Sequence, residues 1–313
     1  DCASFIEESA KKMCEGIDDI AIIACSGGVD STVAAVIANQ AVGDKLHCVY
    51  VDTGLMRKNE TEEIQEMLAH HGLNLTTVFA AERYFTALEG VTEPEHKRKV
   101  IGEQFIRVFE EEQALCGAKY LVQGTIAPDW IESGGGDRDV IKSHHNVGGL
   151  PEDVDLIIVE PLRDFYKDEV RNMAAAMKIP SSNRQPFPGP GLAVRVLGDL
   201  TRERTEACRE ACAIVEEEFE AAAAAGEMEI PWQYFAALLP VSSVGVHGDA
   251  RVYGETIVVR AVRSMDGMSA RYSEIPHSVL QKISSRITNT LKGHVNRVVY
   301  DITHKPPGTI EWE

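Results

Sequence analysis

The sequence predicts an α/β protein: a doubly wound parallel sheet followed by a second, smaller α+β domain. Between residues 20 and 160, short uncharged apolar runs alternate with longer segments whose apolar residues recur at helical spacing. This alternation is typical of parallel strands joined by right-handed helical crossovers, with both faces of the sheet covered. After residue 199 the pattern changes to a long helix, strand-like runs and a further helix. We therefore expect two domains, at residues 1–197 and 198–313.

The apolar runs of the first domain place its strands and helices. Strands are expected at residues 20–24, 46–51, 73–79, 120–123 and 156–159. Helices are expected at residues 2–15, 33–38, from residue 60, at 95–116 and from 170 to 177. Asn59 is expected to cap the third of these helices, with Glu62 reaching back to it. Residues 185–192 cannot form a helix or a paired strand, because three prolines there lack N–H donors.

The second domain is expected to begin with a helix that Thr201 caps and that ends near Ala225. A later helix starts at Pro276 and carries an apolar face. Strand-like runs are expected at 234–239, 256–262 and 297–300. A unit of this composition is suited to oligomerisation or to closing over a substrate.

Composition argues against several classes of protein. The 313 residues are 44% apolar and 26% charged, as in a globular protein with two cores. No apolar run approaches a membrane span and no secretory pattern opens the chain, so we expect a cytoplasmic protein that does not bind a membrane. Seven scattered cysteines do not indicate disulfides. The formal charge of −18 counts against a nucleic-acid partner.

Residues 26–31 read Ser-Gly-Gly-Val-Asp-Ser and join the first strand to a helix. N–H groups at a helix N-terminus lack intrahelical partners and carry partial positive charge, so the loop suits a phosphate. The glycines allow close backbone approach, and the serine hydroxyls add donors. Asp30 would repel a phosphate unless a cation lay between them, which indicates Mg²⁺ or a structural bond to the loop. The alternative is an ordinary strand-to-helix turn.

The strand ends support a ligand site, because polar and glycine residues occupy three of them, at 25–27, 51–53 and 123–125. The carboxyl ends of parallel strands meet at one rim, where such folds bind ligands. The following stretch, about residues 126–155, is irregular and rich in glycine, and we expect it to be a lid whose Lys142 reaches phosphate. His144 and His145 are adjacent, with no Cys or third His nearby, which argues against zinc.

Several motifs together resemble the ATP pyrophosphatase subunit of the GMP synthase family, over essentially the whole chain. They are Ser-Gly-Gly-Val-Asp-Ser at 26–31, Val-Asp-Thr-Gly-Leu-Met-Arg-Lys at 51–58, Gly-Thr-Ile-Ala-Pro-Asp at 124–129, Ile-Lys-Ser-His-His-Asn-Val-Gly-Gly-Leu-Pro at 141–151, Pro-Phe-Pro-Gly-Pro-Gly-Leu at 186–192 and Lys-Pro-Pro-Gly-Thr-Ile-Glu-Trp-Glu at 305–313. The first motif alone indicates only the ATP pyrophosphatase (PP-loop) superfamily, whose fold is adenine nucleotide alpha hydrolase-like. The last three are more specific.

This resemblance implies a ligase that aminates xanthosine 5′-monophosphate (XMP) to GMP. ATP would adenylate the XMP oxygen with loss of pyrophosphate, and ammonia would then displace AMP. The catalytic residues implied are Lys142 and Asp30, with Asp30 also a candidate ligand of the cofactor Mg²⁺. The residues implied for ATP are Ser26, Gly27, Gly28, Val29, Asp30 and Ser31, and the strand ends add Asp52, Gly124 and Thr125. Those implied for XMP are Arg57, Asp249, Lys305 and Glu311.

The implied partners follow from the same resemblance. Single-chain family members carry an amino-terminal glutaminase domain, which this sequence lacks, so the two-subunit arrangement is implied, in which a separate glutamine amidotransferase (glutaminase) subunit would supply ammonia. A homodimer through the second domain is also implied.

Alternatives remain open at this point. NAD synthetase, argininosuccinate synthetase and tRNA thiolation enzymes share the superfamily chemistry, although the last commonly add zinc cysteine pairs or basic domains. A nonenzymatic adenine-nucleotide sensor is a further alternative, and Lys142 and Lys305 count against it. Surface charge would account for Arg57 and Asp249, and a frayed chain end for Lys305 and Glu311.

Overall fold

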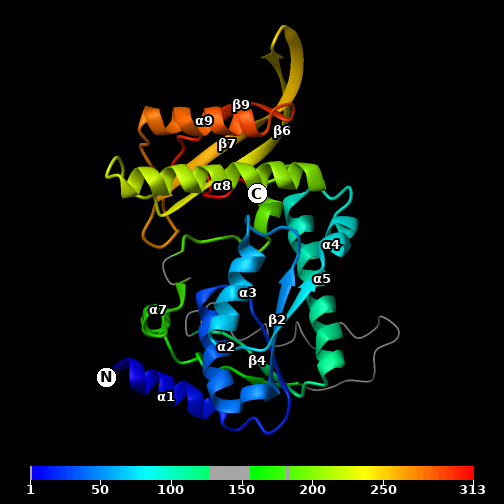
Figure 1. The fold of residues 1–313 in the computed structure, drawn as a ribbon, viewed down its shortest axis with the longest axis vertical. Helices are drawn as coiled ribbons and strands as arrows, with labels where there is room; N and C mark the ends of the chain where they lie inside the picture. The colour runs from blue at the N-terminus through cyan, green and yellow to red at the C-terminus, as the bar shows by residue number, and fades with distance from the viewer. Residues whose placement is uncertain (1, 127–155, 181–183) are drawn as a thin grey trace. The chain divides into compact units, whose positions relative to one another are not determined.

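The computed structural model of the chain describes residues 2–126, 156–180 and 184–313 (Figure 1). Contacts divide the chain into two compact units. The first comprises Asp1–Asp52, Thr61–Ala80 and Glu103–Arg184, and the second comprises Thr53–Glu60, Ala81–Gly102 and Gln185–Glu313. The expected division between residues 197 and 198 concerns folding domains, and it stays a prediction.

The first unit is built on a five-stranded sheet with the order β3-β2-β1-β4-β5. Its strands are β1 (Ala21–Ala24), β2 (Leu46–Asp52), β3 (Leu75–Phe79), β4 (Tyr120–Val122) and β5 (Ile157–Val159). All four neighbouring pairs are parallel, and in the register Ile23 lies opposite Cys48 on one side and Val122 on the other. The parallel sheet expected from the apolar runs is confirmed.

Helices cover both faces of this sheet. They are α1 (Cys2–Cys14), α2 (Val29–Val42), α3 (Glu60–His70), α5 (Pro94–Cys116) and α7 (Lys167–Ala176), with the 3₁₀ turn η1 (Gly43–Lys45). Residues 94–102 of α5 are assigned to the second unit and residues 103–116 to the first. The chain runs from β1 through β2 to β3 in one direction and returns to β4 on the other side of β1, so right-handed crossovers place α2 and α3 opposite α5. Figure 1 shows α5 across the strands from α2 and α3. The doubly wound arrangement is therefore confirmed.

Helix α2 lies in the core of the first unit. Residues 32–38 are buried without interruption, and α1 and α7 pack against this helix. A helix that is apolar on all sides has to be enclosed, and its small alanine and valine side chains permit that. The start of α2 is consequently held in a fixed position relative to the end of β1.

The predicted cap of α3 is wrong. Asn59 has a φ of 60°, in the left-handed region, whereas an N-cap residue has an extended backbone. The carboxylate that accepts a backbone N–H here belongs to Glu60, and the donor is Arg57 N at 2.9 Å. The sequence placed the helix start correctly and misassigned the residues that stabilise it.

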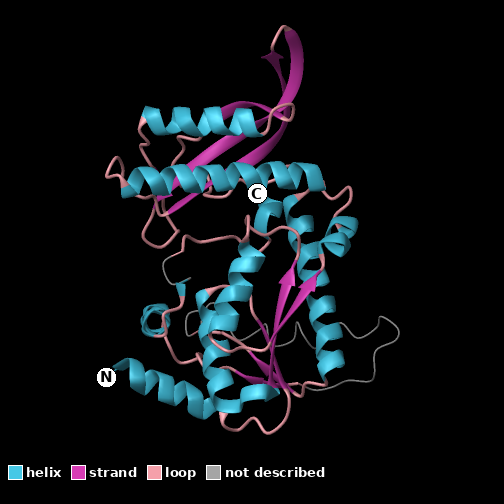
Figure 2. Cartoon of the chain, in the orientation of Figure 1, coloured by secondary structure: helices cyan, strands magenta, loops and turns pink. Residues whose placement is uncertain are grey.

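The second unit is an α+β fold. Its strands are β6 (Gln233–His247), β7 (Ala250–Arg263), β8 (Arg271–Tyr272) and β9 (Val295–Tyr300). β7 pairs antiparallel with β6 and β8 and parallel with β9. Its helices are α4 (Ala81–Ala87), α8 (Arg202–Ala224), α9 (His277–Thr290) and the 3₁₀ turn η4 (Gly191–Val194). Figure 2 shows α8 and α9 running along the sheet.

Several local predictions for the second unit are confirmed. Thr201 caps α8, with its hydroxyl accepting from Arg204 N at 3.1 Å. Helix α9 buries Val279, Ile283 and Ile287 on one face. Strands β6 and β7 run further than expected, because they continue as an exposed hairpin beyond the apolar runs. None of the described helices has the length and apolar character to cross a membrane.

Candidate functional site

The loop at residues 26–31 connects β1 to α2 through a backbone that requires glycine. Gly27 has a φ of 79°, and a Cβ there would lie 2.4 Å from Ile64 Cδ1 on α3. Gly28 follows in an extended conformation as the N-cap of α2, with no side-chain cap. The first N–H groups of the helix therefore depend on partners from outside the helix, which is the arrangement that binds anions.

The serine hydroxyls of this loop bond within the loop itself. Ser26 Oγ and Ser31 Oγ lie 3.1 Å apart, and Ser31 Oγ is 3.2 Å from the Gly28 carbonyl to which it donates. Gly28 N donates to Ser26 Oγ at 3.3 Å. These bonds hold the loop in one conformation before a ligand binds, so little ordering is required on binding.

Gly124 lies against the same loop. β1 and β4 are neighbours whose following connections lead in opposite directions, which makes their boundary the switch point where open α/β sheets bind ligands. A Cβ on Gly124 would be 3.0 Å from the Asp30 carbonyl group and from Ser31 N. Thr125 follows Gly124 and is half-buried. The structure thus brings the two predicted strand ends, 26–31 and 124–125, together.

The two predicted carboxylates of this region differ in environment. Asp52 ends β2, and its Oδ2 accepts from Thr61 Oγ1 at 2.8 Å, so it fastens the start of α3. Asp30 is half-buried in the first turn of α2, where the helix dipole favours a negative charge. Among the described residues no three His, Cys, Asp or Glu side chains cluster to hold a metal. Any Mg²⁺ beside Asp30 would depend on nucleotide oxygens for its other ligands, as Mg²⁺ commonly does.

Lys142 and the remainder of the predicted lid, residues 127–155, lie outside the described residues. Their assignment stays a prediction. The same holds for His144 and His145.

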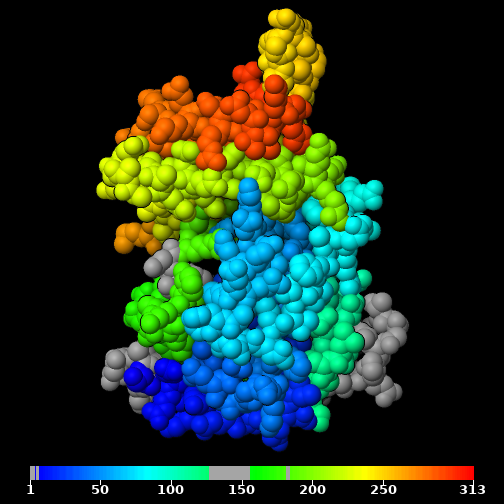
Figure 3. Space-filling model, viewed as in Figure 1, coloured from blue at the N-terminus to red at the C-terminus, as the bar shows by residue number. Residues whose placement is uncertain are grey.

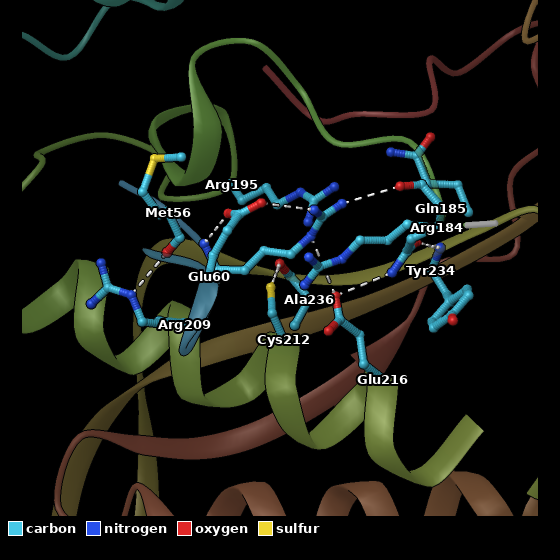
Figure 4. Close-up of polar contacts among 12 residues, drawn as sticks. Met56, Glu60, Arg184, Gln185, Arg195, Arg209, Cys212, Glu216, Tyr234 and Ala236 are labelled. Atoms are coloured by element: carbon cyan, nitrogen blue, oxygen red, sulfur yellow. Dashed lines mark hydrogen bonds and ion pairs between the residues drawn. The ribbon is translucent and has the colours of Figure 1, made fainter. Parts of the chain in front are cut away.

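Arg57 belongs to the second unit, on a connection that α8 holds in place. Arg209 Nε donates to the Met56 carbonyl at 2.9 Å (Figure 4). The NH2 group of Arg209 donates to Gly54 O. Lys58 Nζ pairs with Glu210 at 3.0 Å. Helix α8 therefore holds the backbone before Arg57 and pairs with the side chain that follows it.

Arg57 and Arg195 lie against the same aromatic ring. Their guanidinium carbons are 4.0 Å and 5.1 Å from the centroid of Phe187, and Arg195 is also 4.2 Å from that of Phe235. The ring faces attract both cations, and cation–π attraction strengthens when water is excluded. Arg57 is 9% and Arg195 is 1% exposed, so this stack is largely dry.

Carboxylates and amides complete the surroundings of Arg57. Its NH1 group pairs with Glu60 Oε1 at 3.2 Å, and its NH2 group donates to Gln185 O at 3.1 Å. Gln185 Nε2 donates to Glu216 Oε1 at 3.1 Å, and Gln185 Oε1 accepts from Tyr234 N at 2.8 Å (Figure 4). The guanidinium is consequently oriented by a network from four parts of the chain.

Glu311 is paired with Arg195. Arg195 NH2 lies 2.8 Å from Glu311 Oε1, Arg195 Nε lies 3.2 Å from Oε2, and Gln233 Nε2 donates to Oε1 at 2.8 Å. Burial acts to lower the pKa of Arg195, but attraction and hydrogen bonding to Glu311 together raise it above its ordinary value. Through Arg195, Glu311 comes close to the stack that contains Arg57.

Lys305 and Asp249 have different surroundings. Lys305 Nζ donates to Gly267 O at 2.8 Å, and its backbone pairs with Ala270. Asp249 is exposed in the turn between β6 and β7, whose far end extends past α8 and α9 (Figure 1). Arg57 and Glu311 are thus brought together and Lys305 lies on the same segment as Glu311, whereas the structure does not bring Asp249 to them.

Buried cations are the features that sequence reasoning did not identify. Arg260 interrupts the apolar run of β7, and a charge at such a position signals a buried partner. Lys97, on α5, carries no comparable signal, because it stands among other charged residues of a helix. Phe187 is part of a recognised motif with Arg195 shortly after it, but nothing in the sequence indicated that Arg57, from a distant part of the chain, would lie against the same ring.

We predict that Gly124→Ala weakens ATP binding. The added Cβ would press on the backbone of Asp30 and Ser31, and overpacking of about 1–2 kcal/mol corresponds to a roughly tenfold higher Kd for ATP. Isothermal titration calorimetry would measure the Kd for ATP. Gly16→Ala is the control, because a Cβ there meets nothing within 4 Å. Equal affinities in the two variants would contradict the close approach.

Comparisons with known proteins identify the family of this chain. Residues 219–312 match the family model of the GMP synthase C terminal domain. The chain is 55% identical over 317 residues to a subunit of glutamine-hydrolyzing GMP synthase from Pyrococcus horikoshii, covering 100% of both chains. It is 56% identical to the subunit of the same name from Thermococcus kodakarensis, with 99% of each covered.

A longer relative extends the comparison. The glutamine-hydrolyzing GMP synthase of Clostridium tetani is 55% identical over 315 residues, which are 99% of this chain and 61% of that protein. Identity at this level over the whole chain is enough to assign membership. The chain belongs to the glutamine-hydrolysing GMP synthase family, and within it to the subunit type found in Pyrococcus and Thermococcus.

Proposed function

We propose that the chain catalyses the ATP-dependent amination of XMP to GMP, a step of guanine nucleotide biosynthesis. In this ligase reaction, ATP adenylates the C2 oxygen of XMP and pyrophosphate leaves. Ammonia then attacks C2 and AMP departs. The observation that carries the proposal is whole-chain identity of 55% to a GMP synthase subunit, together with a phosphate-type loop at the sheet's switch point.

The loop at residues 26–31 is the proposed pyrophosphate site of ATP. Its support is the Gly27–Gly28 backbone, which presents the N-terminus of α2 with two hydroxyls beside it. A bound Mg²⁺ would neutralise charge on the phosphate oxygens, with Asp30 as the proposed protein ligand. The loop itself positions the phosphates, and in phosphoryl-type transfer positioning and electrostatics account for most of the rate.

Residues of the second unit are the proposed XMP site. Lys305 would bind the 5′-phosphate as a point charge, Glu311 would accept from purine N–H groups, and Arg57 and Asp249 would complete recognition. Support comes from the proximity of Glu311 to the Arg57 and Arg195 stack. Asp249 lies in an exposed turn, and within one chain no comparable proximity supports its proposed role.

The partners proposed follow from the names of the relatives. The Pyrococcus and Thermococcus relatives are each named as one subunit of a glutamine-hydrolysing enzyme, so we propose that a separate glutaminase subunit supplies ammonia to this chain. A cytoplasmic location and the lack of a nucleic-acid partner stay predictions of the sequence.

The second unit is also the proposed site of homodimerisation. The hairpin end of β6 and β7 projects from the surface (Figure 3). Val244 lies opposite Tyr253 in the register, and Val246 follows on the same face. They are 44%, 67% and 74% exposed, and exposed apolar patches of this kind mark interaction surfaces.

The proposed reaction is tested by mixing the protein with ATP, Mg²⁺, XMP and ammonium. We expect GMP, AMP and pyrophosphate in equal amounts, because each turnover consumes one ATP. The products are separated by ion-exchange chromatography. Folded protein that yields no GMP would refute the assignment, and ATP breakdown with another acceptor in place of XMP would indicate a different superfamily activity.

Lys142→Ala is expected to slow adenylation by about 10²-fold, the usual effect of removing a group that stabilises developing charge. ATP affinity should change little. Rapid-quench measurement of pyrophosphate release would separate the two effects. If Lys142→Ala releases pyrophosphate at the wild-type rate in a single turnover, Lys142 takes no part in adenylation.

Tyr253→Lys is expected to convert a dimer to a monomer, because it places a charge in the proposed apolar contact. Analytical ultracentrifugation measures the mass. Leu115→Lys serves as the control, since Leu115 is similarly exposed, at 79%, and lies in the first unit. A wild-type monomer, or a dimer that survives Tyr253→Lys, would contradict this interface.

A further inference from the structure

Three buried cations of the second unit hold residues 301–313, the segment that carries the proposed XMP ligands Lys305 and Glu311. The cations are Arg260, Arg195 and Lys97, which are 0%, 1% and 0% exposed. A buried charge without partners is very unfavourable, so each must be met by protein acceptors. All three find acceptors in this one segment.

Arg260 shapes the backbone of the segment. From β7 its NH2 group donates to Thr309 O at 3.0 Å and its Nε to Ile310 O at 3.4 Å. Its NH1 group donates to Thr303 O and lies 3.5 Å from Asp301 Oδ1. One guanidinium fork therefore joins the beginning of the segment to residues near its end.

Lys97 holds the segment at Glu313. From α5 its Nζ lies 2.7 Å from Glu313 Oε2, 2.8 Å from Val196 O and 3.3 Å from Ala193 O. These three acceptors match the three protons of an ammonium group. Burial lowers the pKa of Lys97, and the Glu313 carboxylate opposes that change. Glu313 Oε1 also accepts from Gly198 N at 3.3 Å.

We propose that Lys97 is a positioning residue of the XMP site, acting through Glu313 to hold Lys305 and Glu311 where the nucleotide binds. The inference rests on the proposed function. Glu313 lies two residues beyond Glu311, so releasing it would loosen the chain end on which Glu311 lies, although Arg195 and Gln233 would still bond the Glu311 carboxylate. Lys97 itself does not touch the nucleotide in this scheme.

Steady-state kinetics of Lys97→Met test the proposal. The expected result is a KM for XMP about tenfold higher, the size of coupling seen for neighbours in one charge network, with kcat and the KM for ATP within about twofold of wild type. Lys99→Met is the matched control, because Lys99 is exposed on the same helix. Identical KM values for XMP in the two variants, or equal changes in kcat and both KM values, would overturn the proposal.

A double-mutant cycle tests whether Lys97 acts through Glu313. Glu313→Gln alone should raise the KM for XMP, and Lys97→Met with Glu313→Gln should be no worse than Lys97→Met, because no buried charge is then left unpaired. If the increases in the KM for XMP caused by the two single substitutions multiply in the double variant, Lys97 and Glu313 act independently, contrary to the proposal. If Lys97→Met does not fold, Glu313→Gln carries the kinetic test.

Hydrogen exchange measured by mass spectrometry requires no substrate. Residues 305–313 should exchange faster in Lys97→Met than in wild type or Lys99→Met, while β7 keeps its protection. Unchanged protection would show that Lys97 does not hold the segment. A wild-type protein that makes no GMP would instead refute the proposed reaction, so the two failures are distinguishable.

Discussion

The second unit depends on one constraint: charges removed from water must be met by fixed partners. Arg195, Arg260 and Lys97 are buried, and the groups that satisfy them are carboxylates and carbonyls far along the chain. Removing one partner leaves the other buried without a bond, which is unfavourable. These pairs therefore link distant segments into one cooperative structure. The region around Phe187 and Glu311 owes its order to this linkage, more than to regular secondary structure.

Much of the fold could be predicted from the sequence because it follows from local patterns. The apolar runs at 20–24 and 46–51 are long enough to be buried strands, and alternation with helices determines a parallel sheet. The loop at 26–31 could be predicted as an anion site, since its glycines and its place before a helix have direct conformational meaning. Gly124 could be placed near it because parallel strand ends share one rim.

The remainder could not be predicted because it depends on contacts between residues far apart in sequence. Lys97 and Glu313 are separated by 216 positions, and neither stands in a local pattern that specifies the other. The cap of α3 was misassigned for a related reason. Glu60 accepts from Arg57 in an arrangement that α8 and Phe187 help to fix, and a four-residue pattern contains no information about them.

The way Arg260 binds its segment has a consequence for labelling the protein. At Thr303, Thr309 and Ile310 the guanidinium contacts carbonyl oxygens, which every residue possesses, so at these three positions it is indifferent to the side chain. At Asp301, by contrast, it faces a side chain. Ile302 is 66% exposed beside these contacts. A fluorophore attached there through a substituted cysteine would leave the anchoring geometry intact, giving an optical reporter on the backbone that presents Lys305.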